Sequence, residues 1–408
     1  MGKPKIRFEG YSEDWEQRKL GDITTKIGSG KTPKGGAAAY KDDGIALIRS
    51  QNVNGDRVDL SDVVFIDEQT DEDMKNSRVL KGDVLLNITG ASIGRSAVFT
   101  RELRANVNQH VCIIRTKGSD ASPEFIQLNI ISSNGQNQID SFQAGGGREG
   151  LNFHQIGKME FLYPGIEEQQ KIGQYFANLD HLITLHQRKY DETKTLKKYM
   201  LQKMFPQNGE KVPEIRFDGF TEDWEQRKLG DNIVEYTEKT TENNQYPVLT
   251  SSRKGIFFQT DYYDGNQIAS ADNTGYNIVP YGFFTYRHMS DDEIFHFNIN
   301  DIAENGIVST LYPVFTTDEN LDSRYLQYQL NYGREFARYA ILQKQGGSRT
   351  YMYLNKLRNL YLTVPTAIEE QKKISEYFTN LDHLITLHQR KCNELKEIKK
   401  YMLQNMFV

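Results

Sequence analysis

A pair of nearly identical segments recurs along this chain and constrains its fold more than any other feature. Residues 6–22 read IRFEGYSEDWEQRKLGD and residues 215–231 read IRFDGFTEDWEQRKLGD, with three conservative differences in 17 positions. A second pair, at 166–190 and 368–392, shares the core LDHLITLHQRK. The blocks 23–165 and 232–367 between these repeats show no common register. Decay of one duplicated half would not spare the flanks, so we interpret the pattern as one scaffold that presents two different surfaces.

The second pair of repeats predicts two long helices. Apolar or partly apolar side chains alternate in steps of four and three, as in the seam of a coiled coil. In the first copy they are Ile172, Phe176, Leu179, Ile183, His186 and Tyr190, and in the second Ile374, Phe378, Leu381, Ile385 and His388. The two helices should pack antiparallel if the halves obey a pseudo-two-fold axis.

Four further leucines widen the apolar face of these helices beyond what one partner helix needs. They are Leu182 and Leu185 in the first copy and Leu384 and Leu387 in the second. Exposed apolar stripes of this kind are typical of protein-binding surfaces. The leucines are therefore candidates for binding a partner subunit, although they could also only complete the coiled coil.

The variable blocks combine β-branched and aromatic runs with short helical segments. Strands are expected at 84–89, 96–100 and 110–116, and in the second block at 255–259, 277–288 and 306–315. Helices are expected at 123–131 and 323–339. The predicted fold class is mixed α/β, with two globular domains separated by a two-helix antiparallel coiled coil. The predicted divisions are 1–165, 166–205 (first helix), 206–367 and 368–408 (second helix).

Motifs for catalysis are incomplete. Gly28–Thr32 (GSGKT) resembles the end of a phosphate-binding loop, but Thr25 stands where that loop needs glycine, and Pro33 disfavours a helix at the lysine. Gly90–Gly94 (GASIG) fits a nucleophile elbow, but a strand-like run follows instead of a helix. The chain has no Pro-Pro pair, which a methyltransferase motif for S-adenosylmethionine chemistry would need. We therefore expect no catalytic residues and no bound cofactor or metal.

Charge and composition limit how the chain could bind DNA and where in the cell it works. The net charge is −5, and block 23–165 carries 16 basic and 17 acidic residues against 11 and 15 in block 232–367. Any contact with DNA must then come from local patches rather than from the overall field. No apolar run is long enough for a membrane span, and the first ten residues lack a signal-peptide core. The expected location is the cytoplasm, and with two cysteines no disulfide framework is expected.

Taken in order, these segments resemble the specificity subunit of Type I restriction-modification enzymes. The likeness rests on WEQRKLGD before each variable block, a proline followed by IEEQ and LDHLI after it, and the run KIGSGKTPKGG, DGIALIRSQNVNG, LKGDVLLNITGASIGRSAVF and ANVNQH within the first block. It covers nearly the whole chain. The resemblance implies that each block is a target-recognition domain that reads one half of a bipartite site in double-stranded DNA, and that the chain is not itself an enzyme.

The same resemblance implies partners. Two modification subunits would dock on the chain and methylate adenine, and restriction subunits would join the larger complex. S-adenosylmethionine, ATP and Mg would then bind to those subunits. An enzyme, either methyltransferase or ATPase, is the first alternative, and the motifs it needs are incomplete. A scaffold without DNA specificity is the second, and it would not explain why the two middle blocks differ.

Candidates for DNA contact are the forked or amide side chains on short polar loops, because these groups can pair with base edges. In the first domain they are Arg49, Gln51, Asn108, Gln109 and Arg148, with Lys31 and Ser92 as candidates for phosphate contact. In the second domain they are Ser252, Arg253, Asn273, Gln345, Ser348, Arg349 and Tyr351. Arg148 and Arg349 each follow a glycine-rich stretch. The alternative is that these are ordinary solvated loops, or that the two arginines bind the last carbonyls of a preceding helix.

Overall fold

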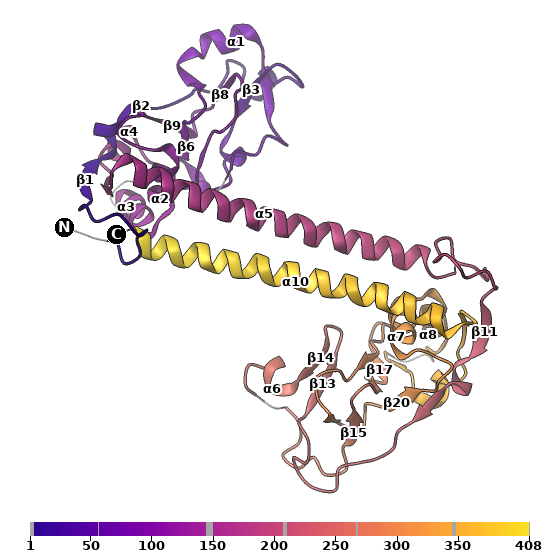
Figure 1. Ribbon diagram of the computed structural model, residues 1–408. Helices are drawn as coiled ribbons and strands as arrows, with labels where there is room; N and C mark the ends of the chain where they lie inside the picture. Colours follow the sequence, from indigo (N-terminus) through magenta and orange to yellow (C-terminus); the bar gives the residue numbers. More distant parts are fainter. Residues whose placement is uncertain are drawn as a thin grey trace. The chain divides into compact units, whose positions relative to one another are not determined.

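The computed structural model describes residues 4–55, 57–143, 150–206, 210–266, 268–344 and 348–407. The chain divides into two compact units. Unit 1 comprises Met1–Arg188 and His388–Val408, and unit 2 comprises Lys189–Leu387. The two longest helices, α5 (Ile166–Lys203) and α10 (Ile368–Met406), each contribute one end to unit 1 and the other to unit 2 (Figure 1).

Unit 1 holds two four-stranded sheets and a separate strand pair. The first sheet is antiparallel and has the order β2 (Thr24–Ser29), β9 (Val111–Thr116), β6 (Val84–Asn87), β7 (Ser96–Val98). The second has the order β4 (Val64–Ile66), β3 (Ile45–Ile48), β8 (Ala105–Val107), β5 (Arg78–Val79), and β3 runs parallel to β8. Strand β1 (Glu16–Lys19) pairs with β10 (Glu160–Tyr163). The strands predicted at 84–89, 96–100 and 110–116 are therefore confirmed within one or two residues.

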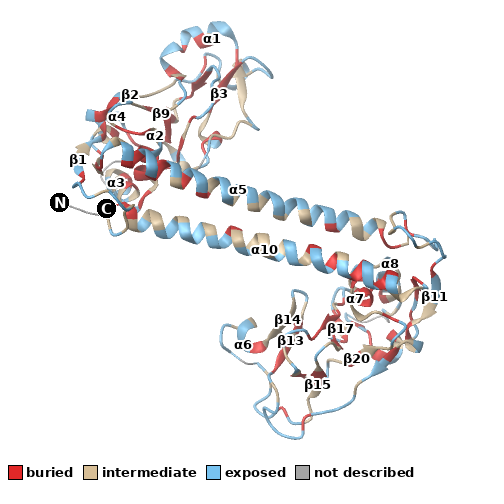
Figure 2. Cartoon of the chain, viewed as in Figure 1, coloured by how far each residue is buried: buried red, intermediate tan, exposed pale blue. Residues whose placement is uncertain are grey.

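Among the described residues of unit 1, the short α-helices are α1 (Glu68–Asp73), α2 (Pro123–Ile131), α3 (Ser133–Gln143) and α4 (Phe153–Gly157). Helix α2 has the predicted bounds, because the Ser122 hydroxyl accepts from the Phe125 amide and Pro123 stands at the first helical position. Its Phe125 packs on Trp15 and on Phe407 from the end of α10, with ring centres 5.8 and 5.5 Å apart. Figure 2 shows that buried residues gather in these sheets and helices.

Unit 2 has one four-stranded antiparallel sheet and several two-stranded ones. The larger sheet has the order β12 (Ile233–Glu235), β20 (Val314–Thr317), β16 (Phe284–Thr285), β18 (Asn298–Ile299). The pairs are β11 (Glu225–Lys228) with β22 (Tyr361–Val364), β13 (Leu249–Ser252) with β14 (Gly255–Phe258), β15 (Asn277–Pro280) with β19 (Asn305–Val308), and β17 (Met289–Ser290) with β21 (Thr350–Tyr351). The three expected strand regions all contain strands, but the two longer ones are each interrupted by a turn.

The helices of unit 2 are α6 (Gln259–Tyr262), α7 (Ser323–Tyr332), α8 (Arg334–Leu342) and α9 (Leu354–Leu357). The continuous helix expected over 323–339 is wrong, because the chain is extended at Gly333, with φ −74° and ψ 141°. A β-carbon there would lie 2.3 Å from the Gln329 carbonyl oxygen, so the break needs glycine. The core of this unit includes Trp224, Tyr325 and Phe378, with Phe205 from the end of α5 between the last two.

Helices α5 and α10 run antiparallel within each unit. In unit 1, His186 faces His388 with Nδ1 atoms 3.0 Å apart, and Lys399 donates to Asp180. In unit 2, Lys197 donates to Asp382. The predicted seam residues near the start of each helix have a different role, however. Ile172, Phe176 and Leu179 are buried in the core of unit 1, because α5 begins inside that globular unit, and their counterparts on α10 are buried in unit 2.

The glutamine of each IEEQ motif makes the same set of hydrogen bonds in its own unit. The Gln169 side chain accepts from the Ser122 amide and donates to the carbonyls of Asp120 and Pro164. The Gln371 side chain accepts from the Asp322 amide and donates to the carbonyls of Asn320 and Pro365. Ser122 and Asp322 cap α2 and α7. The repeated motif thus docks α2 in unit 1 and α7 in unit 2 onto a long helix in the same way.

Candidate nucleic-acid interface

Three polar loops of unit 1 lie side by side because two of them follow neighbouring parallel strands. Ile48 of β3 stands opposite Val107 of β8, so Arg49 and Asn108 leave the sheet at the same edge. The Asn108 amide donates to the Ile48 carbonyl at 3.1 Å, and the Gly30 amide donates to the Asn108 carbonyl at 3.2 Å. The loops that begin at Gly30, Arg49 and Asn108 are therefore joined through their backbones.

The turn between β6 and β7 adjoins the same loops. The Asn87 side chain donates to the Ser50 carbonyl at 2.8 Å, and the Ile88 amide donates to the His110 carbonyl. Ser92 lies on this turn, which leads directly into the antiparallel strand β7, as the sequence predicted for a strand-to-strand turn. We call these four loops the unit 1 loop edge. Among the candidates of the first domain, it carries Lys31, Arg49, Gln51, Ser92, Asn108 and Gln109.

Arg148 lies outside the described residues. Gly150, the first described residue after that gap, forms a bridge with Thr89 next to the loop edge.

The candidate side chains at this edge differ in how far they are committed to contacts within the protein. Arg49 donates to the Asp62 carbonyl at 2.9 Å and lies 5.8 Å from the centre of the Tyr40 ring. Asn108 is buried, and its side-chain oxygen accepts from the His110 amide. Gln109 accepts from the Thr32 hydroxyl at 2.6 Å. Lys31 is exposed and makes no hydrogen bond or ion pair with any described residue. Lys31 is thus the most available of them.

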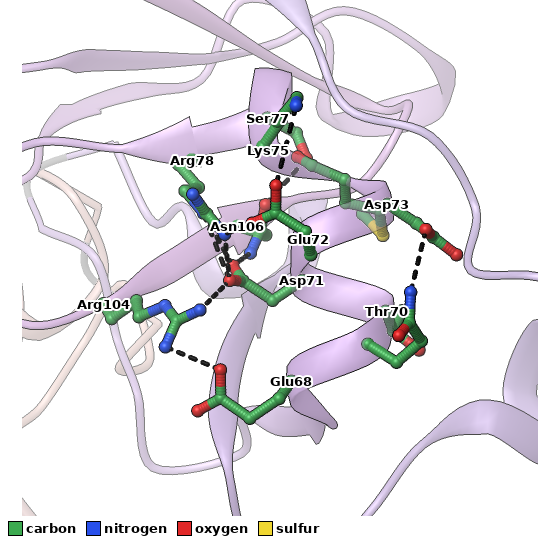
Figure 3. Close-up of polar contacts among 12 residues, drawn as sticks. Glu68, Thr70, Asp71, Glu72, Asp73, Lys75, Ser77, Arg78, Arg104 and Asn106 are labelled. Carbon is green, nitrogen blue, oxygen red and sulfur yellow. Dashed lines mark hydrogen bonds and ion pairs between the residues drawn. The ribbon is translucent and has the colours of Figure 1, made fainter.

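The buried carboxylate of Asp71 binds side chains on the strands that lead to this edge (Figure 3). Asp71 of α1 is fully buried and accepts from Arg78 on β5, from Arg104, and from the Asn106 amide group on β8. Burial works to raise the pKa of Asp71, but the hydrogen bonds from Arg78, Asn106 and Arg104 outweigh it and leave that pKa below its ordinary value. The network fixes strand β8, which ends at Val107, directly before Asn108.

Asn106 also connects this network to the Gly30 loop. Its side-chain oxygen accepts from the Ser77 hydroxyl at 2.8 Å. A β-carbon on Gly30 would lie 2.9 Å from the Ser77 β-carbon and 1.6 Å from the Val107 carbonyl oxygen. The loop that carries Lys31 therefore packs directly against the strand that carries Asn106, and only glycine allows this approach.

In unit 2, several candidates gather around the segment Met289–Asp292. Ser252 and Arg253 lie at the turn of the β13–β14 hairpin, and Arg253 donates to Asp292. Tyr351 of β21 pairs with Met289 of β17, and Arg349 donates to Asp291 at 2.8 Å. Ser348 is exposed beside Arg349, and Gln345 lies outside the described residues. The structure thus brings together candidates that are about 100 positions apart in the sequence.

A polar hollow of about 220 Å³ lies beside this group. It is lined by Thr250, Ser251, Ser252, Arg253, Tyr262, Tyr263, Arg287, Met289, Ser290, Asp291, Ile294, Phe295, His296 and Tyr312. We call it the unit 2 hollow. Arg287, His296 and the three tyrosines were missed by the sequence analysis, which looked for polar loops and passed over an arginine inside the apolar run FFTYRHM. Burial lowers the pKa of His296, and the nearby Arg253 acts in the same direction, so this imidazole is mostly uncharged near neutral pH.

Asn273 is not part of this group. It is fully buried, and its side chain both donates to the Asn244 side chain and accepts from the Asn244 amide, at 2.8 and 2.7 Å. Asn244 has a positive φ of 57°, which an asparagine tolerates better than most residues. Asn273 therefore holds a loop together rather than presenting its amide at the hollow.

The four candidate leucines for partner binding lie on the long helices. Leu182, Leu185 and Leu384 are 40%, 36% and 41% exposed, and Leu387 is half-buried. Leu179 and Leu381, three positions before Leu182 and Leu384, are buried. On both helices, apolar side chains therefore remain exposed next to the positions that are buried in a core.

Comparison with known proteins gives a consistent result. The sequence model of the family described as "Type I restriction modification DNA specificity domain" matches residues 12–195 and 221–397. The MjaX type I restriction enzyme specificity subunit of Methanocaldococcus jannaschii is 22% identical over 420 residues, which cover 98% of this chain and 94% of that protein. The EcoBI specificity subunit of Escherichia coli is 28% identical over 189 residues, or 44% of this chain and 39% of that protein.

A solved structure agrees at the level of the fold. The S subunit of a Type I restriction-modification system from M. genitalium superposes with a TM-score of 0.60 at 10% identity, over 100% of this chain and 99% of that one. Two DNA-specificity domains on a repeated helical scaffold define a class of DNA-recognition protein. The chain belongs to the Type I restriction-modification DNA specificity family, and it carries two such domains.

The described residues also bear on two other kinds of site. No helix in the described ranges is long and apolar enough to cross a membrane. Within the same ranges, no three His, Cys, Asp or Glu side chains come together as a metal site would need.

Proposed function

We propose that this chain is the DNA-recognition subunit of a Type I restriction-modification complex, and that each of its two domains reads one half of a bipartite target. The unit 1 loop edge would read one half-site and the surface around the unit 2 hollow the other. In this proposal Lys31 and Ser92 contact phosphates, while Arg49, Gln51, Asn108, Gln109 and Arg148 serve base recognition. Ser252, Arg253, Gln345, Ser348, Arg349 and Tyr351 are the corresponding residues of the second domain, whereas the buried Asn273 is not among them.

The observation that carries this proposal is the repeated scaffold around unlike loops. Gln169 and Gln371 make matching contacts, and β1 with β10 matches β11 with β22, yet the polar groups at the two candidate surfaces differ in type and in arrangement. A protein that reads two different half-sites in a defined relative orientation needs this combination. A protein that reads a palindrome would need two like surfaces.

The chain would not itself be catalytic. Two modification subunits would bind through the surfaces that include Leu182 and Leu185 and, in the second copy, Leu384 and Leu387, and would methylate adenine. Restriction subunits would join this complex. S-adenosylmethionine, ATP and Mg would bind to those partners, and the complex would work in the cytoplasm, where the cell's DNA is.

Exchange of one variable block tests the proposal. Residues 232–367 are replaced by the corresponding block of another specificity subunit, the complete system is expressed, and methylated adenines are mapped across the genome. One half of the methylation motif should change and the other should remain, with half-site centres about 10 bp or roughly 34 Å apart if both domains face one side of the duplex. A change in both halves would contradict the assignment of one half-site to each domain.

A further inference from the structure

Arg287 is held on a rigid part of the backbone. It lies between β16 and β17, and the residues on either side of it, Tyr286 and His288, are buried. The Tyr286 hydroxyl donates to the Met352 carbonyl at 2.9 Å. The His288 ring stacks on Tyr353, with ring centres 4.8 Å apart. Because side chains alternate along an extended segment, burial of both neighbours turns the Arg287 side chain outward, and it is exposed.

Three other cations near the unit 2 hollow are already paired with acidic residues on one short segment. Arg253 pairs with Asp292, Arg349 with Asp291 and Lys344 with Glu293. Hydrogen bonds from Arg253 and Ser290 hold the pKa of Asp292 well below its ordinary range, so this carboxylate stays ionised beside its arginine. DNA would have to displace these carboxylates before either arginine could bind a base with its full fork of donors.

Arg287 carries no such commitment. Within the part of the chain that the structure describes, no residue forms a hydrogen bond or an ion pair with its guanidinium. Its fork of N–H donors is therefore available, and a guanidinium matches the O6 and N7 acceptors that guanine presents in the major groove.

The size of the hollow favours a surface that meets a macromolecule. Its volume of about 220 Å³ lies below the roughly 300–1,000 Å³ of most small-molecule sites. Tyr262, Tyr263 and Tyr312 provide aromatic walls of the hollow that Arg287 also lines, and His296 adds an uncharged ring nitrogen. Such walls restrict where a guanidinium can point, and this restriction is what base reading requires.

We propose that Arg287, rather than Arg253 or Arg349, is the principal base-reading residue of the second domain, and that it recognises a guanine in the second half-site. This inference rests on the proposed function of the chain. Arg253 and Arg349 then act mainly to hold the segment Asp291–Asp292 that borders the hollow.

The experiment compares four variants of the full chain, each co-expressed with its modification subunits. Arg287→Ala removes the fork, and Arg287→Lys keeps the charge without the planar fork. Arg253→Ala tests a paired arginine, and Arg324→Ala is the matched control on α7, where a half-buried arginine pairs with Asp301 outside the hollow. Binding is measured on target duplexes, on duplexes with single base-pair changes and over a range of salt concentrations. Methylated adenines are mapped genome-wide, and thermal unfolding checks folding.

For Arg287→Ala we expect an affinity for the target about 5- to 140-fold lower, which corresponds to about 1–3 kcal/mol, and relaxed specificity at one G·C pair of the second half-site. Arg287→Lys should not restore that specificity, and Arg253→Ala should have a smaller effect. Equal loss on all sequences, rescued by lysine and with a weaker salt dependence, would overturn base reading in favour of phosphate contact. Altered stoichiometry of the complex with unchanged DNA binding would overturn it in favour of a protein contact.

If Arg287→Ala behaves like Arg324→Ala while exchange of residues 232–367 still changes one half-site, the inference fails and the proposed function stands. If the exchange changes neither half-site, the proposed function itself fails.

Discussion

Arg216 and Glu370 are joined by two hydrogen bonds of 2.7 and 2.8 Å, although 154 positions separate them in the chain. Arg7 and Glu168 form the same two-point ion pair in unit 1, with the same two distances. Each arginine belongs to the IRF motif of a short repeat, and each glutamate to the IEEQ motif of a helix repeat. These contacts explain why both motifs recur together: the first motif anchors the start of each block to the long helix that follows it.

Loss of this anchor should destabilise one unit strongly. Glu370 is fully buried and also accepts from the Trp224 indole, so Arg216→Ala leaves a buried carboxylate without its main partner. Breaking a buried pair in this way costs about 3–5 kcal/mol. Unit 1 and unit 2 each contain one of the chain's two tryptophans, Trp15 and Trp224, both buried. Denaturant unfolding in a Trp15→Phe background therefore reports on unit 2 through Trp224.

The control for this measurement is Arg324→Ala, which removes a partly exposed pair with Asp301 in the same unit and should change stability by less than about 1 kcal/mol. A similarly small effect of Arg216→Ala would show that the buried pair does not stabilise unit 2.

The Asp71 network should make unit 1 sensitive to acid. Because the pKa of Asp71 is depressed in the folded chain, its contribution to stability is fully present above the unfolded pKa of about 3.9 and is lost as pH falls through the lower folded pKa. Asp71→Asn should lower the stability of unit 1 at neutral pH and flatten its dependence on pH below about 4. Trp15 fluorescence in a Trp224→Phe background measures both effects. Asp73→Asn, on the exposed side of α1, should leave the acid profile unchanged.

Two neighbouring glycines offer a matched test of the unit 1 loop edge. Gly30→Ala would place a β-carbon 1.6 Å from the Val107 carbonyl oxygen, whereas Gly28→Ala meets only the end of the Lys26 side chain at 4.0 Å. Overpacking of this kind costs about 1–3 kcal/mol, and here it must displace the loop that carries Lys31. Genome-wide mapping of methylated adenines should show weakened recognition of the first half-site for Gly30→Ala. Recognition of that half-site should be unchanged for Gly28→Ala. Equal behaviour of the two variants would contradict a role for this packing in recognition.

The exposed leucines predict how many partners the chain binds. Leu182→Ser with Leu185→Ser, and separately Leu384→Ser with Leu387→Ser, should each remove one of two modification subunits. Folding should be affected less than by Leu179→Ser or Leu381→Ser, which alter buried positions. Native mass spectrometry of the co-expressed complex gives the stoichiometry. A wild-type complex with a single modification subunit would contradict the equivalence of the two surfaces.

The architecture was largely predictable because it rests on repetition and on periodicity. Helix α2 matches its predicted bounds, and the positions of α5 and α10 follow from their repeats. The break at Gly333 was missed because a single glycine inside a helical pattern is often tolerated, and only the approach to the Gln329 carbonyl decides against it here. The burial of Phe176 inside a globular core was missed because the spacing of a stripe does not say which element covers it.

The candidate site was less predictable, since it depends on which side chains become committed to one another. The sequence placed Arg49 and Asn108 on separate loops, and their proximity arises from the parallel pairing of β3 with β8. Nothing in the order of residues distinguishes Arg253, paired with Asp292, from Arg287, which has no such pair among the described residues. That difference is a property of tertiary contacts.

The placement of Phe407 also sets an order of events during synthesis. Phe407 and Met406 lie in the core of unit 1, against Phe125 and Phe176, whereas unit 2 is a continuous stretch that ends at Leu387. Domains generally fold as they leave the ribosome, at about 5–20 residues per second. Here the core of unit 1, which is synthesised first, stays incomplete until residues some 200 positions later are made. Unit 2 can complete its core before unit 1 does. A released chain truncated before residue 400 would therefore hold a complete unit 2 and an unfinished unit 1.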